Sequence, residues 1–150
     1  MSYISSSGGV TDGDKGDITV TGSGTTWTID SDIVASGTYA PTVTASTNTD
    51  GAVTASTAQY IRGRTVITVS GEFTANPTLT ATATSFELSL PVVSNIGAIN
   101  DVAGSAVCGN IAAMTAEVIG VIANDTAKVQ WISSDITSQV WSYSYTYRIV

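Results

Sequence analysis

The sequence predicts an all-β protein, an antiparallel β-sandwich of the jelly-roll kind preceded by a flexible N-terminal arm and a small β-hairpin. Apolar residues make up 43% of the 150 residues against 11% charged, and Ser and Thr dominate the polar remainder, as on half-buried pleated surfaces. Several segments alternate apolar and polar residues with the period of two that a strand requires. Gly, Pro, Asn and Asp divide them into about eight or nine short strands.

The N-terminal part predicts an arm followed by the hairpin. Residues 1–16 are rich in Ser, Gly and Asp, which is too dense in turn-forming residues for a helix or a strand. Residues 17–30 alternate on both sides of a Gly-Ser-Gly turn at 22–24. Two strands alone bury too little apolar surface to be stable, so the hairpin must dock on something else. The candidates for contact with another surface or with another copy of the chain are Val10, Ile18, Val20, Trp27 and Ile29.

We therefore divide the chain into residues 1–36, the arm with its hairpin, and residues 37–150, the sandwich domain. A connector is predicted over residues 31–37, and a new extended element over residues 38–44. Pro41 places that element at a sheet edge or a bulge, because proline cannot donate a hydrogen bond to a neighbouring strand.

Two central segments predict strands with one buried face. Residues 65–73 and residues 85–90 both alternate cleanly, which leaves Glu72 and Glu87 on the outward faces. Gly71 falls in the inward series, where a glycine indicates a bulge or a close approach of another backbone segment. The predicted inward residues are Ile67, Val69, Phe73, Phe86, Leu88 and Leu90.

Three further strands are predicted over residues 104–113, 117–123 and 128–132, with a turn at Asn124-Asp125 between the last two. A helix is conceivable only over residues 112–119, but that window is short and runs into β-branched residues, so a strand is favoured.

The last strand is the most regular. It carries an aromatic column on one face and Ser, Thr and Arg on the other. Such a column must be buried against a second sheet or against neighbouring subunits. Its members are Trp141, Tyr143, Tyr145 and Tyr147.

The charge and cysteine content limit the partners. The net charge of −7 with five basic residues argues against nucleic acid and anionic membranes, which need a positive surface. No apolar run approaches the length of a membrane span, so no membrane insertion is expected. The start of the chain lacks a secretion signal, which favours synthesis in a cytoplasm. Cys108 is the single cysteine, so no intramolecular disulfide is expected.

The sequence predicts no enzyme, no cofactor and no metal centre. It contains no histidine, the usual general base and zinc ligand. Glu72 and Glu87 are the only carboxylates that could be nominated as a glycosidase pair on adjacent strands, and their outward positions favour a solvated surface instead. Tyr39, Tyr60 or exposed parts of the aromatic column could stack on sugar rings, although core or subunit contacts are favoured.

Asp12, Asp14 and Asp17 suggest a calcium loop. An EF-hand loop starting at Asp12 needs Gly and Glu where this chain has Asp17 and Ser23. The pattern therefore excludes an EF-hand, and non-specific cation binding by this acidic loop remains open.

Residues 13–30 read GDKGDITVTGSGTTWTID and resemble a segment of tail fibre and other virion proteins of tailed bacteriophages, where it often follows collagen-like repeats. Only residues 13–18 fit Gly-x-y triplets, so the chain has the junction without the shaft. Gly63-Arg64 departs from the family, in which Gly-Asn is common. Four other segments resemble a β-sandwich domain of phage fibre tips: residues 38–43, 59–62, 66–71 and 88–91.

The resemblance implies a virion structural protein, made in the host cytoplasm, that forms homotrimers and is anchored to phage capsid or tail proteins by its N-terminus. It makes the five N-terminal contact candidates, Val10, Ile18, Val20, Trp27 and Ile29, candidates for virion attachment. As a head spike, a fibre tip or a decoration module, it would assist attachment to a host-surface glycan through avidity. The alternative is a capsid cement protein that stabilises the head without binding a receptor. A polysaccharide depolymerase is less favoured, because no catalytic constellation can be assembled.

Overall fold

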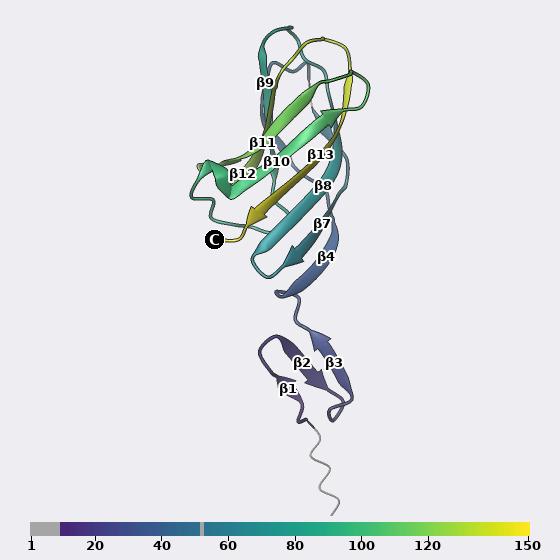
Figure 1. Ribbon diagram of the computed structural model, residues 1–150, viewed down its shortest axis with the longest axis vertical. Coiled ribbons are helices and arrows are strands. Elements are labelled where there is room, and N and C mark those ends of the chain that lie inside the picture. The colour runs from purple at the N-terminus through teal and green to yellow at the C-terminus, as the bar shows by residue number, and fades with distance from the viewer. Residues whose placement is uncertain (1–9, 52) are drawn as a thin grey trace, which may run out of the picture.

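The structure is a computed structural model that describes residues 10–51 and 53–150. Over these residues the regular elements are β-strands and one short 3-10 helix, η1. The strands form a three-stranded sheet near the N-terminus and a ten-stranded sheet that curls on itself (Figure 1). In chain order the elements are β1 (Gly13–Asp14), β2 (Ile18–Thr21), β3 (Thr26–Ile29), β4 (Val34–Tyr39), β5 (Val43–Thr47), β6 (Thr54–Ala55), β7 (Ala58–Gly63), β8 (Val66–Ala75), β9 (Ala83–Ser89), η1 (Ile99–Asp101), β10 (Val102–Cys108), β11 (Thr115–Val121), β12 (Thr126–Ile132) and β13 (Gln139–Arg148).

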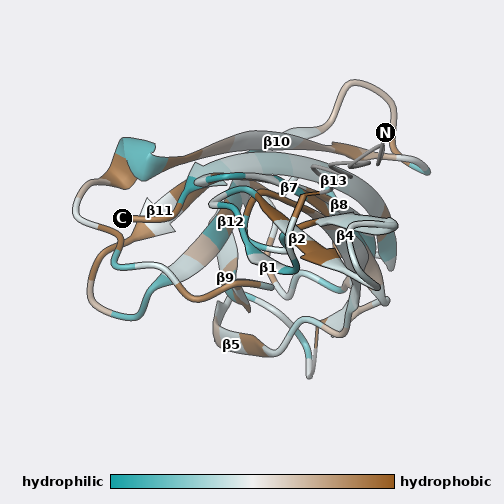
Figure 2. Ribbon diagram, turned by 90° about the horizontal axis from the view of Figure 1, so that it is seen from below, coloured by the Kyte–Doolittle hydropathy of each residue, from teal (hydrophilic) through white to brown (hydrophobic). Residues whose placement is uncertain are grey.

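The ten-stranded sheet folds over into the two layers of a sandwich. Its strand order is β4-β7-β8-β13-β10-β11-β12-β9-β5, and β6 pairs with β8. Figure 2 shows β4, β7, β8, β13 and β10 in one layer, with β12, β9 and β5 in the other. The ring centroids of Phe73 and Phe86, from opposite layers, lie 4.7 Å apart, and those of Trp131 and Trp141 lie 5.0 Å apart. The predicted antiparallel β-sandwich is therefore confirmed.

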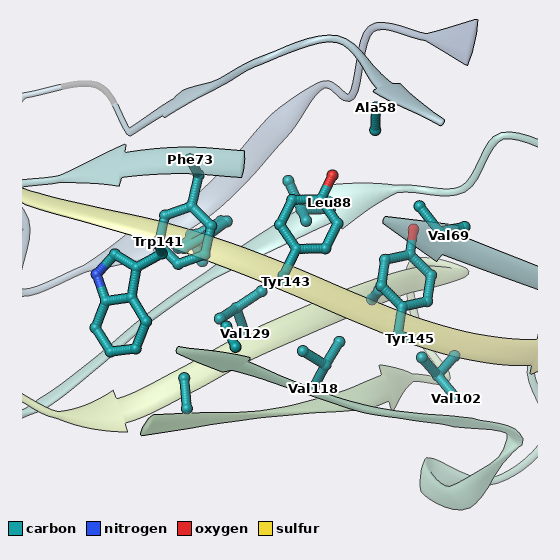
Figure 3. Close-up of a cluster of buried hydrophobic side chains, with 14 of the residues drawn as sticks. Ala58, Val69, Phe73, Leu88, Val102, Val118, Val129, Trp141, Tyr143 and Tyr145 are labelled. Carbon is teal, nitrogen blue, oxygen red and sulfur yellow. The ribbon is translucent and has the colours of Figure 1, made fainter. Parts of the chain in front are cut away.

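Strands β8 and β13 form the middle of the first layer. They pair without interruption from Ala75 opposite Gln139 to Val66 opposite Arg148. Along β13, buried and exposed residues alternate strictly, and the inward side chains meet those of β8 and the other layer (Figure 3). The alternation predicted for residues 65–73 and for the last strand is confirmed, because β8 and β13 each have one face on the core and one face outside.

Gly71 makes room for a tyrosine ring. It lies opposite Tyr143 in the ladder, and a Cβ atom at Gly71 would stand 2.6 Å from Tyr143 Oη and 2.9 Å from Ala58 Cβ. The register with β13 continues through this position without a shift. On the other edge of β8 the register shifts by one residue, because three residues between Ala55 and Gln59 face the two between Phe73 and Ser70. Side chains, not backbone, approach Gly71, so the predicted close backbone approach is wrong, whereas the extra residue opposite it on the β6–β7 edge agrees with the predicted bulge.

The N-terminal elements differ from the prediction in two respects. Gly13–Asp14 forms β1 and pairs with β2, although this lead was expected to form no strand; a two-residue strand is too short to show a period. The strand β4 begins at Val34, inside the predicted connector.

Pro41 divides the element predicted over residues 38–44. The chain leaves β4 before the proline and enters β5 after it, and these two strands lie at opposite edges of the large sheet. The prediction of an edge position is confirmed, since proline here joins two edge strands and interrupts no ladder.

The second half of the chain follows the predicted order with shifted bounds. The segments predicted over residues 104–113, 117–123 and 128–132 are β10, β11 and β12, each beginning two residues earlier. Most of the window 112–119 belongs to β11, so no helix forms there, as favoured. The chain also contains more strands than predicted, because short ones such as β1 and β6 carry no sequence pattern.

Buried tyrosine hydroxyls gather in the core. Tyr39 Oη and Tyr145 Oη lie 2.9 Å apart. Tyr147 Oη donates a hydrogen bond to the carbonyl oxygen of Val92 at 2.7 Å and accepts one from its N–H at 3.1 Å. Burial raises the pKa of Tyr147 to about 12 from its usual value near 10, and it also raises the pKa of Tyr39 and of Tyr145.

These raised pKa values predict unfolding in alkali. The folded-state pKa exceeds the unfolded value of about 10, so the tyrosines contribute stability that is full below pH 10 and lost as the pH rises towards the folded pKa. We expect the urea midpoint to fall steadily from pH 10 to about pH 12, with phenolate absorbance rising as the protein unfolds. Tyr147→Phe removes one titrating group and is expected to flatten that slope. A midpoint independent of pH over this range would contradict the prediction.

Candidate functional site

Apolar side chains occupy one face of the small N-terminal sheet. In the β2–β3 ladder Ile18 lies opposite Ile29, and Val20 lies opposite Trp27. Residues directly opposite each other in antiparallel strands point to the same side of a sheet. We call the face formed by Ile18, Val20, Trp27 and Ile29 the hairpin face. The other side of these strands carries only threonines: Thr19, Thr21, Thr26 and Thr28.

Much of the hairpin face is exposed. Val20 is buried and Ile18 is half-buried, but Trp27 is 56% exposed and Ile29 is 57% exposed. Trp27 Nε1 donates a hydrogen bond to the carbonyl oxygen of Gly24 at 3.1 Å, which holds the indole beside the turn. Val10, the fifth candidate for attachment, is 40% exposed. Large apolar groups left in water on so small a sheet favour contact with another surface.

The acidic lead organises the turns of this sheet. Asp12 accepts hydrogen bonds from the N–H groups of Ser23 and Gly24 at 3.1 and 2.9 Å. Asp14 accepts one from Gly16 N–H at 2.6 Å, and Asp17 pairs with an arginine. The three carboxylates thus have separate partners, and the described residues contain no group of three or more acidic, Cys or His side chains placed to hold a metal ion.

Arg64 connects the small sheet to the sandwich. Its side-chain Nη2 lies 2.5 Å from Asp17 Oδ2, and its backbone N–H donates a hydrogen bond to the carbonyl oxygen of Ile33 at 2.6 Å. The small sheet extends beyond the end of β4 and β7, away from the sandwich (Figure 1). The hairpin face is therefore carried at one end of the molecule.

Removing this ion pair is expected to loosen the junction without unfolding the sandwich. Both side chains are more than half exposed, so Arg64→Ala should cost about 1 kcal/mol or less in free energy of unfolding. Residual dipolar couplings of the two sheets should then no longer fit a single alignment. Arg148→Ala, which removes a positive charge from β13, is the control. If the residual dipolar couplings of Arg64→Ala still fit one rigid body, the ion pair does not set the orientation of the small sheet relative to the sandwich.

The aromatic column lies inside the sandwich. Trp141, Tyr143, Tyr145 and Tyr147 are at most 3% exposed, and Figure 3 shows the first three in a row along β13. The chain's own two layers bury them. The column is therefore core, and the possibility that it stacks on sugars or contacts other subunits is wrong.

The other two sugar-stacking candidates are also built into the wall of the sandwich. Tyr39 and Tyr60 are half-buried and pack against the core, with their rings edge to face and their centroids 6.4 Å apart. Among the aromatic residues that the structure describes, Trp27 is the one that is more than half exposed.

The nominated glycosidase pair is not assembled. The strands β8 and β9, which carry Glu72 and Glu87, are not neighbours in the sheet, so the prediction of adjacent strands is wrong. Glu87 is only 8% exposed, and its Oε2 accepts hydrogen bonds from Asn124 Nδ2 at 2.9 Å and Thr126 Oγ1 at 2.7 Å. The solvated position predicted for Glu87 is also wrong, because these partners cover it.

A groove of about 440 Å³ lies on the second layer. No prediction from the sequence includes it, since its residues come from β5, β9 and the β11–β12 hairpin, which lie far apart in the chain and meet only in the folded sheet. Outward polar residues on single strands indicate nothing beyond a solvated face. The residues lining the groove are Thr47, Ala83, Thr84, Ser85, Glu117, Lys128, Gln130, Trp131 and Ile132.

Comparison of the chain with protein-family models, curated proteins and solved structures found no match. In the part of the chain that the structure describes, no helix has the length and apolar character needed to cross a membrane. Fold and site together define an all-β sandwich protein that carries an exposed apolar surface on a small sheet at one end.

Proposed function

We propose that this protein is a structural component of a tailed-phage virion, anchored through its N-terminal part and presenting its β-sandwich to the outside. The hairpin face carries the proposal. It lies within residues 13–30, the segment that resembles virion proteins, and it exposes Trp27 and Ile29 at the end of the molecule away from the sandwich. An exposed apolar surface in that place suits docking on a capsid or tail protein.

We further propose that three copies associate through the outer face of the first sandwich layer. Strands β4, β7, β8, β13 and β10 contain only three charged residues, Arg62, Glu72 and Arg148. Copies of a chain with net charge −7 repel each other least through such a face. It also carries exposed apolar side chains: Val34, Ile61, Val66, Val107 and Val140.

Trimeric spikes present in many copies would turn weak contacts with a host-surface glycan into useful attachment. When one contact has formed, the next is effectively intramolecular, so avidity exceeds the affinity of a single site. This function requires no catalytic group.

Particles that lack the protein test this function. We expect them to adsorb poorly to host cells while they keep their resistance to heat and osmotic shock. Normal adsorption with lost resistance would instead identify a capsid cement protein. Shortening of host polysaccharide by the purified protein would overturn the non-enzymatic assignment.

The anchoring role has a separate test in Trp27→Ser and Ile29→Ser. Both variants should fold and yet be absent from purified particles. Ile122→Ser is the matched control, because Ile122 is similarly exposed, at 54%, but lies on the β11–β12 turn. Normal incorporation of the hairpin variants, or an electron-microscopy map in which the hairpin end points away from the particle, would overturn this orientation.

A further inference from the structure

A continuous row of polar side chains crosses the groove on the second layer. Glu117 on β11 lies opposite Gln130 on β12, Gln130 lies opposite Ser85 on β9, and Ser85 lies opposite Thr47 on β5. Because paired residues of antiparallel strands share a face, the four side chains stand side by side on the outer surface. A second pair on that face, Ile132 with Ala83, gives the groove an apolar end.

The row contains both donors and acceptors of hydrogen bonds. Gln130 Nε2 donates a hydrogen bond to Glu117 Oε1, which orients the amide and leaves its oxygen as an acceptor. Ser85 and Thr47 each offer a hydroxyl that can donate and accept. A ligand rich in hydroxyl groups, which also donate and accept, matches this arrangement.

Lys128 places a positive charge in the groove. It lies opposite Glu87 in the β9–β12 ladder, yet the two do not form an ion pair; among the described residues the one ion pair joins Arg64 and Asp17. Asn124 and Thr126 hold the Glu87 carboxylate through its Oε2. Glu87 does not line the groove, whereas Lys128 does. Among the described residues no carboxylate lies within ion-pair distance of the Lys128 ammonium, and the Glu117 carboxylate, which lines the same groove, accepts a hydrogen bond from Gln130 instead.

We infer that this groove binds an acidic saccharide, with Lys128 holding its carboxylate or phosphate and the row from Glu117 to Thr47 binding its hydroxyls. The inference rests on the proposed function and locates the receptor contact within it. An ammonium is a compact point charge suited to an anion. The groove of about 440 Å³ lies within the range of about 300–1,000 Å³ typical of small-molecule sites. The exposed side chain of Ile132 can pack against the C–H face of a sugar ring.

Three probes test the inference: an oligogalacturonate, a phosphorylated maltooligosaccharide and neutral maltotriose. We expect at least one anionic probe to shift the backbone amide signals of Ser85, Lys128 and Gln130, and to bind more tightly than maltotriose. The two anionic probes distinguish a carboxylate from a phosphate. Lys128→Met, which keeps the apolar stem, should weaken that binding about tenfold or more, as expected for the loss of a charged hydrogen-bond partner.

The controls distinguish a loss of binding in the groove from a loss of folding, and a failure of this inference from a failure of the proposed function. Arg148→Met removes a positive charge from the other layer and should bind normally, and thermal unfolding confirms that each variant is folded. Gln130→Ala is a second groove variant, expected to bind more weakly. No binding of either anionic probe, equal binding of maltotriose, or unchanged binding by both groove variants would overturn the inference. Particles carrying Lys128→Met that adsorb normally would overturn it while leaving the proposed function intact, whereas normal adsorption of particles without the protein would overturn the function itself.

Discussion

Replacing Trp141 by alanine is expected to lower the free energy of unfolding by about 3–5 kcal/mol. Trp141 is completely buried, lies nearly parallel to Phe73 with the ring centroids 5.6 Å apart, and contacts Trp131 of the opposite layer. Removing the indole leaves a cavity between the two layers of the sandwich, whose spacing the other aromatic side chains maintain, so the site can collapse only in part.

Urea denaturation followed by circular dichroism measures this loss. Trp27→Ala is the matched control, since Trp27 is 56% exposed and its removal should change stability by about 0.5 kcal/mol or less. Trp141→Phe should cost less than Trp141→Ala, because it keeps a ring and removes an Nε1 that has no hydrogen-bond partner among the described residues. Equal losses at positions 27 and 141 would show that Trp141 does not support the contact between the layers.

Asn48→Ala is expected to be nearly as damaging, at about 2–4 kcal/mol. Asn48 Nδ2 lies 3.0 Å from the carbonyl oxygen of Leu79 and 2.7 Å from Oγ1 of the buried Thr84. Its Oδ1 accepts hydrogen bonds from Thr78 Oγ1 at 2.7 Å and Leu79 N–H at 2.9 Å. One side chain therefore ties the end of β5 to the loop before β9, and alanine leaves several polar groups without partners.

The backbone of Asn48 contributes as well. Its φ of 54° lies in the left-handed region, which asparagine tolerates better than alanine. Asn48→Gly keeps that conformation and loses only the hydrogen bonds, so it should be about 1 kcal/mol more stable than Asn48→Ala. Unfolding in urea measures both variants. If both retain wild-type stability, the network does not stabilise the fold.

Strands with one face on the core could be predicted from the sequence. The two faces of β8 and β13 differ in environment along their whole length, so burial imposes a period of two that can be counted in the residues. The same reasoning places Ile18, Val20, Trp27 and Ile29 together, because the turn sets the register between them. How exposed Trp27 and Ile29 are could not be predicted, since exposure depends on what else packs on the sheet.

Features that depend on the order of strands in the sheet could not be predicted. Nothing local to β8 indicates that it lies beside β13. The outward position of Glu87 was predicted, but its burial results from Asn124 and Thr126 on another hairpin. The groove around Lys128 exists only because β12 lies between β11 and β9. Pairings between strands that are far apart in the sequence leave no pattern that can be recognised in a short stretch of residues.

The place of β13 in the sheet has a consequence for how the chain folds during synthesis. It inserts between β8 and β10, so β8 emerges from the ribosome long before its main partner exists. Meanwhile β8 exposes the unpaired backbone groups of one edge and an uncovered apolar face. The β10-β11-β12 meander pairs neighbours in the chain and can form early, whereas closing β8 onto β13 requires a long loop. We therefore expect slow folding, with the nascent chain prone to aggregate or bind chaperones until β13 is made.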